Sequence, residues 1–384
     1  MQADPMTSPD QVARLQNALP FWLSLAIVPV LGLAMWLGGA WYFLVPGMVM
    51  VLYPILDAMV GLDTHNNAPD TTERQLFWYR LVTMIWPPIQ FVVLFGGLAY
   101  AVHADISGME SVLLMFSIGV ITGAVGIVFA HELMHQSNRT ERSLGDILMA
   151  MVLYSHFRTE HLLVHHSYVG TPRDAVTARY NEGYYRFLLR VLPQSLASAW
   201  RAERAMLARK GLPVWHRSNP FWRYLGLQGG VVLLAAAIGG WTGILFLALQ
   251  AFVAVAYLEL VNYVEHYGLT RKYLGDGTYE IVLPRHSWNA AHKATNWLLI
   301  NLQRHSDHHF KPRRRFPLLQ HHDATEAPQL PYGYPIMGVL ALIPRAWRRR
   351  MNPRVRKWRA MYYPEITDWS DYKAARNPMP KGAS

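Results

Sequence analysis

The 384-residue sequence contains no cysteine, and only 16% of its residues are charged. Without cysteine thiolates the chain cannot hold an iron–sulfur centre of its own. It also has no glycine-rich dinucleotide fingerprint after a strand, so any redox chemistry would need electrons from another protein. The scarcity of charge, together with 52% hydrophobic residues and a mean hydropathy of +0.08, is typical of a membrane protein.

Six long apolar runs each approach the roughly 20 residues needed to cross a hydrocarbon core. They cover residues 21–39, 41–60, 80–102, 110–130, 221–239 and 241–262, with Asp57 inside the second run. The first run lacks a basic leading segment and a small-residue cleavage site, and another apolar run follows at once, which argues against a signal peptide. The sequence therefore predicts an all-α, polytopic membrane protein with six transmembrane helices.

Basic residues predict the orientation, because Lys and Arg accumulate on the cytoplasmic side of a membrane. The stretches 38–41, 103–108 and 239–243 carry neither residue, whereas the segment between His131 and Phe221 carries twelve. We therefore expect both termini to be cytoplasmic, in a bacterial inner membrane. A further basic cluster follows the spans and is interleaved with Trp347 and Trp358; it comprises Arg348, Arg349, Arg350, Arg354, Arg356 and Lys357. This position favours membrane lipids over nucleic acid as the partner of the basic charge.

Nine of the seventeen histidines lie at predicted helix ends on that same side. They occur in "FAHELMHQSN", "TEHLLVHHSY", "NYVEHYGL" and "LQRHSDHH", and are His131, His135, His161, His165, His166, His266, His305, His308 and His309. Spacings of three and four residues put imidazoles on one helix face, which is the simplest way to gather metal ligands. The other eight lack this spacing and favour surface or hydrogen-bonding roles. We single out His286 and His292 among them; the remaining six are His65, His103, His156, His216, His321 and His322.

The first motif also reads HExxH, the signature of a zinc protease in which Glu132 would be the general base. One zinc ion takes three or four protein ligands and has no redox chemistry, so it would leave five or six histidines without a role. Two metal ions with four or five ligands each would use all nine. Imidazole is a suitable ligand for iron, and an iron ion with open coordination positions can activate O2.

The three histidine motifs HxxxH, HxxxHH and HxxHH resemble the histidine boxes of the integral-membrane diiron desaturases and hydroxylases. Within that superfamily, "HELMH", "EHLLVHH", "NYVEHYGL", "HSWN" and "LQRHSDHH" resemble the alkane 1-monooxygenases over residues 20–360. The resemblance implies six transmembrane helices under a cytoplasmic, histidine-rich cap in which the nine histidines hold two iron ions. Gln136 departs from the family pattern, in which a basic residue is common after the first box.

The same resemblance implies a membrane hydroxylase domain at 20–360, a cytoplasmic segment at 1–19 and a tail at 361–384. Its activity would be O2-dependent hydroxylation of the terminal methyl of n-alkanes taken from the bilayer, with electrons from rubredoxin and its flavin-dependent reductase. A relative acting on xylene-type methyl groups, a lipid desaturase and, more distantly, the zinc protease remain alternatives.

Three further sets of residues are candidates for supporting roles. Carboxylates that could orient the histidines are Glu132, Glu160, Glu259, Glu265, Asp174 and Asp307. Bulky side chains that could limit the depth of an apolar substrate tunnel are Met50, Tyr53 and Phe129. Basic residues after the third box that could dock an acidic electron carrier are Lys311, Arg313, Arg314 and Arg315.

Overall fold

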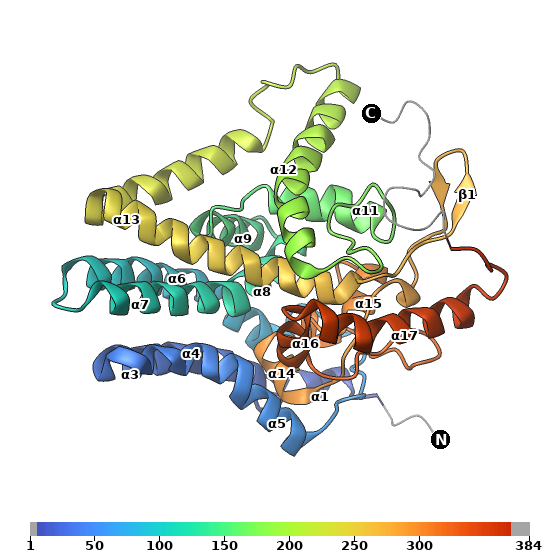
Figure 1. The fold of residues 1–384 in the computed structure, drawn as a ribbon, viewed down its shortest axis with the longest axis horizontal. Coiled ribbons are helices and arrows are strands. Elements are labelled where there is room, and N and C mark those ends of the chain that lie inside the picture. The colour runs from blue at the N-terminus through green and yellow to red at the C-terminus, as the bar shows by residue number, and fades with distance from the viewer. Residues whose placement is uncertain (1–5, 370–384) are drawn as a thin grey trace.

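Helices dominate the computed structural model, which describes residues 6–369, as the sequence predicts (Figure 1). Parts of the predicted terminal segments, residues 1–5 and 370–384, lie outside the described residues. The exception to the all-helical prediction is an antiparallel hairpin of β1 (Tyr273–Gly275) and β2 (Thr278–Tyr279). Its turn contains Asp276 and Gly277, both with positive φ, and Asp-Gly is a favoured pair for such a turn.

Five helical segments are long and apolar enough to cross a membrane. The first is Leu15–Leu37, formed by α2 (Leu15–Trp22), η1 (Leu23–Ala26) and α3 (Ile27–Leu37). The second is Gly39–Val60, formed by η2 (Gly39–Phe43), α4 (Leu44–Gly47), η3 (Met48–Leu52) and α5 (Tyr53–Val60). The others are α6 (Phe77–His103), the segment Gly108–His135 and α13 (Phe221–His266); Gly108–His135 comprises α7 (Gly108–Ile121), η4 (Thr122–Ile127) and α8 (Val128–His135).

The fifth segment, α13, folds back on itself (Figure 1). Gly239 and Gly240 have non-helical backbone angles, and Gly240 has a φ of +56°, which a glycine adopts without strain. The two helical arms on either side of this bend are in close contact, because a Cβ on Gly243 would lie 2.2 Å from the carbonyl oxygen of Ala235. The arms match the predicted runs 221–239 and 241–262. Six crossings remain a prediction, since that number counts each arm as a span.

The chain is π-helical over Thr122–Ile127, immediately before the first histidine motif. Gly119 lies just before this wide turn and Gly126 lies within it, and a neighbouring helix approaches closely at both positions. A Cβ on Gly119 would lie 2.6 Å from Val253 Cβ, and one on Gly126 would lie 2.0 Å from Gln90 Oε1. Wide turns of this kind often occur at functional sites, because the extra residue reorients the side chains that follow.

The remaining elements gather mainly at the end of the spans where α8 and α15 lie (Figure 1). They are α1 (Pro9–Val12), α9 (Arg139–Met151), α10 (Phe157–Thr159), η5 (Glu160–His165), α11 (His166–Tyr168), α12 (Tyr184–Arg209), η6 (Pro284–His286), α14 (Lys293–Leu298), α15 (His305–Phe310), η7 (Phe316–Leu318), α16 (Tyr334–Ala341) and α17 (Pro344–Tyr362). This cap carries most of the histidine motifs.

A buried ion-pair network fastens the cap to the spans. The Glu141 carboxylate, which is fully buried in α9, accepts hydrogen bonds from Arg80 of α6 at 2.7 Å and from Arg315 at 2.9 Å. Arg315 also pairs with Glu73 at 2.7 Å. Because Arg315 follows the third histidine motif in sequence, the network fixes that motif against α6 and α9.

Candidate metal centre

All nine predicted histidines converge in one buried region, although they come from four separate stretches of the chain. The end of α8 carries His131 and His135, and the α13 C-terminus carries His266. The π-helical turn η5 and the start of α11 carry His161, His165 and His166, and α15 carries His305, His308 and His309. Seven of the nine are buried, and His131 and His166 are half-buried.

The histidines form two groups of ring nitrogens, each of which could hold one metal ion. The first group contains His131, His135, His161 and His308, and the second contains His165, His266, His305 and His309. Within each group the candidate ligand atoms lie within 4.8 Å of one another. The ninth histidine, His166, belongs with the first group, because its Nε2 lies 3.0 Å from Nε2 of His161 and 3.1 Å from Nε2 of His308.

The distances between nitrogens fit metal coordination. Two nitrogens bound at right angles to one ion, with metal–nitrogen bonds of about 2.1 Å, are about 3.0 Å apart. The Nε2–Nε2 distances are 2.9 Å between His135 and His161, 3.1 Å between His266 and His305, and 3.0 Å between His305 and His309. The buried Nε2 atoms of His131 and His165 have no hydrogen-bond partner, as expected of nitrogens that face an ion.

Burial also favours the neutral form of five of these imidazoles. It lowers the pKa values of five of them well below the usual range, with a further lowering from neighbouring imidazoles; the five are His161, His166, His305, His308 and His309. Neutral imidazole is the form that binds metals. The residues present therefore fit two metal ions.

Two of the six predicted carboxylates lie behind the histidines. Asp174 Oδ2 accepts a hydrogen bond from His165 Nδ1 at 2.9 Å and another from Thr177 at 2.6 Å. This bond leaves the His165 Nε2 lone pair free for a ligand role. Glu265 Oε1 lies 3.3 Å from His305 Nδ1, without hydrogen-bond geometry.

Three of the other four carboxylates pair with residues outside the two histidine groups. Glu132 accepts from Gln136 at 2.9 Å and lies 3.8 Å from Arg315. Asp307 pairs with both Arg314 and His322, and Glu259 accepts from Tyr154 and Asn262. Long-range packing provides these partners, and motif spacing carries no information about it.

Glu160 is the fourth of these carboxylates. It is fully buried, and neither of its oxygens has a hydrogen-bond partner among the described residues. Burial, reinforced by the charges of Asp174 and Glu259, raises the pKa of Glu160 well above its usual range. Its side chain is therefore held in the neutral form rather than as an acceptor for a histidine.

Two small apolar cavities lie next to each other along α13. The inner cavity, of about 30 Å³, touches both histidine groups through His131, His161 and His305; its other lining residues are Gly123, Ile127, Val128, Phe157, Tyr257, Leu258, Val261, Asn262, Glu265 and Leu302. The second cavity, of about 10 Å³, is lined by Met50, Tyr257, Leu260, Val261, Val264, Tyr334 and Gly338. Tyr257 and Val261 border both cavities and separate them.

The three predicted tunnel residues thus differ in position. Met50 lines the second cavity. Tyr53 and Phe129 line neither: the Tyr53 hydroxyl donates to the Leu23 carbonyl at 3.5 Å, and Phe129 packs edge-on against Trp86. Tyr257 and Val261 were missed, although their positions nine and five residues before His266 on the same apolar run were a usable signal.

A third cavity, of about 360 Å³, reaches the first histidine group from another side. It is lined by Met134, His135, Gln136, Ser137, Arg142, Leu162, Leu163, His166, Pro312 and Arg313. The lining differs in kind from that of the inner cavity, because it includes two arginines. The metal centre thus has one apolar approach and one approach that is partly basic.

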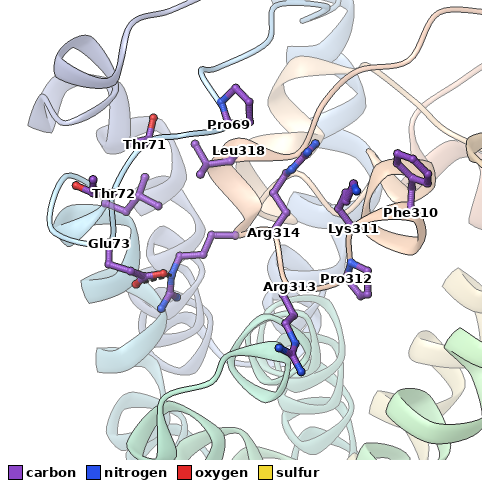
Figure 2. A pocket seen from close by; sticks show the side chains of 12 residues that line it. Pro69, Thr71, Thr72, Glu73, Phe310, Lys311, Pro312, Arg313, Arg314 and Leu318 are labelled. Carbon is purple, nitrogen blue, oxygen red and sulfur yellow. Dashed lines mark hydrogen bonds and ion pairs between the residues drawn. The ribbon is translucent and has the colours of Figure 1, made fainter.

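The four predicted docking residues border a groove of about 670 Å³, with Lys311 and Arg313 across from Thr71 and Thr72 (Figure 2). Lys311 and Arg313 are exposed, but Arg315 is buried in the Glu141 network and is not available to a partner. Arg314 is half-buried and makes two hydrogen bonds to Asp307, at 2.8 and 2.7 Å. Only two of the four side chains are therefore free to meet a protein.

The two other histidines close to the motifs lie outside both groups. The buried Nε2 of His286 lies 2.8 Å from the Tyr363 hydroxyl and 3.2 Å from Glu280. Hydrogen bonds from His286 and Tyr363, acting against burial, lower the pKa of Glu280 to about 2. His292 precedes α14, and its carbonyl accepts from Gln303. The His286 ring is thus tied to structural partners, whereas the buried Nδ1 of His292 has no hydrogen-bond partner among the described residues.

Comparison with known proteins places the chain in a family. The fatty acid desaturase family is matched over residues 109–341. Alkane 1-monooxygenase 2 of Pseudomonas aeruginosa is 39% identical over 360 residues, covering 91% of this chain and 94% of that protein. Alkane 1-monooxygenase 1 of the same organism is 41% identical over 334 residues, covering 83% and 84%. The xylene/toluene monooxygenase hydroxylase component XylM of Pseudomonas putida is 28% identical over 249 residues, covering 65% of each. With more than 30% identity across most of its length, the chain belongs to the alkane 1-monooxygenase family, within the wider fatty acid desaturase family.

Proposed function

We propose that this chain is a membrane oxidoreductase that converts medium- to long-chain n-alkanes into 1-alkanols at a non-haem diiron centre. One atom of O2 enters the terminal C–H bond, and the other leaves as water after accepting two electrons and two protons. The observation that carries this proposal is the convergence of nine histidines, in two groups, beside an apolar cavity at the ends of candidate membrane-spanning helices.

The histidine groups are the sites that would hold the two iron ions, five residues in the first group and four in the second. Bound iron would supply the reductive activation of O2. Asp174 holds His165 in the tautomer whose Nε2 faces the second group. The packed rings and the apolar lining keep bulk water away from the inner cavity.

The substrate offers no charge to bind, so selectivity depends on holding an apolar chain in a fixed position. We infer that the alkane enters from the bilayer near Met50 and reaches the histidines past Tyr257 and Val261. The inner cavity, of about 30 Å³, is much smaller than an ordinary ligand pocket, which has at least about 300 Å³. An alkane chain can therefore enter only if the shared wall of Tyr257 and Val261 moves.

Electrons would come from rubredoxin, itself reduced by a flavin-dependent reductase, because the chain has no cysteine for its own iron–sulfur centre. Lys311 and Arg313 are exposed for an acidic carrier, and Arg313 also borders the cavity that reaches His135 and His166. The carrier would then dock near the first histidine group. The metal centre and both termini would then face the cytoplasm from the inner membrane.

The test is turnover by the purified chain in nanodiscs with iron, rubredoxin, its reductase and O2. We expect 1-alkanols from octane and hexadecane, and two iron ions per chain by elemental analysis. Methyl-hydroxylated xylene without 1-alkanol would favour the XylM-like alternative, and an unsaturated acyl product would favour a desaturase. One zinc ion per chain and no iron would favour a zinc protease, although Glu132 pairs with Gln136 rather than with the histidines.

A further inference from the structure

The cap helix α12 carries an exposed apolar stripe. Tyr185, Leu189, Pro193, Leu196 and Trp200 follow one another at steps of four, four, three and four residues, so they share one narrow face of the helix. Leu189 is 76% exposed, Tyr185 54% and Leu196 47%. Other α12 side chains, including Phe187, Val191 and Ser198, are buried against the protein. The stripe thus points away from the rest of the chain.

Contacts at both ends extend this stripe onto other elements. The Tyr185 hydroxyl donates to the Leu342 carbonyl at 3.1 Å, next to exposed Leu342 and Ile343 after α16. At the other end, the Trp200 ring lies 5.7 Å from Trp215 and 5.0 Å from Phe221, and Trp215 lies 6.2 Å from Trp222. We call the α12 stripe, Leu342, Ile343, Trp215 and Trp222 the apolar belt.

The belt lies at the level where membrane spans begin. Phe221 and Trp222 are the first residues of α13, a candidate span. Figure 1 shows α12 crossing the direction of α6 and α7, toward the end where α15 lies. Tryptophan is enriched at membrane–water interfaces, where its ring is partly in lipid and its N–H is hydrated.

Exposed arginines flank the stripe. Arg186 and Arg204 lie within about a quarter turn of it, and Arg201 slightly farther round the helix. A helix with an apolar stripe, a basic flank and tryptophan nearby matches the chemistry of an interfacial membrane helix, whose apolar face enters the headgroup and acyl boundary by about 5–10 Å.

We propose that the apolar belt lies in the lipid interface of the leaflet on the histidine side, with α12 parallel to the membrane plane. The leucines contact the acyl chains, the tryptophans sit at the headgroup level, and the arginines meet lipid phosphates. This placement sets the depth of the cap independently of the reaction that the metal centre performs.

The absence of cysteine makes the test direct, because a single introduced cysteine is the only site for a thiol label. Leu189→Cys, Leu196→Cys and, as a matched control, Ala197→Cys would each carry an environment-sensitive fluorophore in nanodiscs. Ala197 is exposed and adjacent to Leu196, but about 100° around the helix. Lipids brominated in the acyl chain report contact with the membrane interior, and iodide reports contact with water.

We expect the labels at 189 and 196 to lose most of their fluorescence to brominated lipid and little to iodide, and the label at 197 to show the reverse. Equal iodide quenching at all three positions would overturn the proposal and place α12 in water. Protection from both quenchers at 189 and 196 would also overturn it, because a second protein copy would then cover the belt, and cross-linking through the same cysteines would detect that copy.

Discussion

At the residue scale, neighbouring histidines in one motif serve different halves of the metal centre. His165 belongs to the second group, whereas His166 lies against the first. The third motif splits in the same way, with His308 in the first group and His305 and His309 in the second. Successive residues in a helix point about 100° apart, so adjacent rings diverge. In α15 the rings that stay together are four residues apart, His305 and His309, whereas in the π-helical turn η5 they are five apart, His161 and His166. The HH pairs therefore bridge the two groups.

This division predicts unequal effects of single histidine substitutions. His305→Ala removes one of four ligands from the second group, so we expect about one iron ion to be lost per chain and turnover to vanish. His166→Ala leaves four histidines in the first group and should lose less iron. His321→Ala, which lies outside both groups, should leave iron and turnover near wild type. Iron analysis of the purified variants measures this, and equal iron loss in all three would contradict the division.

Asp174 tests the role of a residue that acts through a ligand. Asp174→Asn removes the charged acceptor of the His165 Nδ1 proton, and losses of about 10–100-fold in metal affinity are usual for such changes. Glu326→Gln, on an exposed carboxylate paired with His322, is the control. Competition with a chelator measures the affinity. An unchanged iron affinity would mean that the ring orientation does not depend on Asp174.

Tyr257 should set chain-length preference if the alkane passes the wall between the two cavities. Tyr257→Ala lengthens the available space and should move the preference toward longer alkanes, while Tyr257→Trp should move it toward shorter ones. Each methylene group of the alkane that becomes buried contributes about 0.8 kcal/mol to the free energy of binding. Relative rates from hexane to hexadecane measure the shift, with Tyr53→Phe as the control. An unchanged profile for both Tyr257 variants would place the path elsewhere.

At the element scale, the cap is held to the spans by charge as well as by apolar packing. Glu141 in α9 joins Arg80 of α6 to Arg315, and Arg315 lies six residues after His309. Arg315 is only 7% exposed and Glu141 is fully buried. A buried pair need not add net stability, but removing one partner leaves an uncompensated charge.

Glu141→Gln should therefore destabilise the protein by about 3–5 kcal/mol, the usual cost of breaking a buried ion pair from one side. Glu73→Gln, at a carboxylate that is 61% exposed and also pairs with Arg315, should cost at most about 1 kcal/mol. Thermal unfolding in detergent compares the two. Similar losses of stability for the two variants would mean that the Glu141 carboxylate is hydrated in solution.

At the scale of the whole molecule, the metal centre joins segments that are far apart in the sequence. Each histidine group draws ligands from at least three of the four histidine-bearing stretches. A ligand that binds only the folded state stabilises that state by about 2.7 kcal/mol when the free ligand concentration is a hundred times the dissociation constant. Iron should thus hold the cap together as well as support turnover.

Removing the metal with a chelator should lower the unfolding temperature, and adding Fe2+ should restore it in a concentration-dependent way. Zn2+ also accepts imidazole ligands, so we expect it to restore stability but not turnover, since it has no redox chemistry. Scanning fluorimetry and product formation on the same samples separate the two effects. Turnover with Zn2+ alone would exclude the redox mechanism.

The sequence alone determined the helical class, most of the span positions and all nine converging histidines. These features depend on local pattern: apolar runs of about 20 residues make spans, and histidines three or four residues apart share a helix face. The hairpin after His266 was not anticipated, although an Asp-Gly pair marked its turn, whereas the bend at Gly239 and Gly240 falls where the last two predicted apolar runs meet.

Only the tertiary structure decided how the histidines divide, which carboxylate supports them and what borders the apolar cavities. Arg315 looked available in sequence, yet packing buried it against Glu141. Asp174 pairs with one of the nine histidines, whereas Asp307 pairs with Arg314 and His322. Tyr257 and Val261 became the wall between two cavities because α13 packs beside both η4 and α16. The contact of Arg315 with Glu141 joins residues 174 positions apart, and its contact with Glu73 joins residues 242 positions apart. No local spacing encodes which distant partner a side chain will meet.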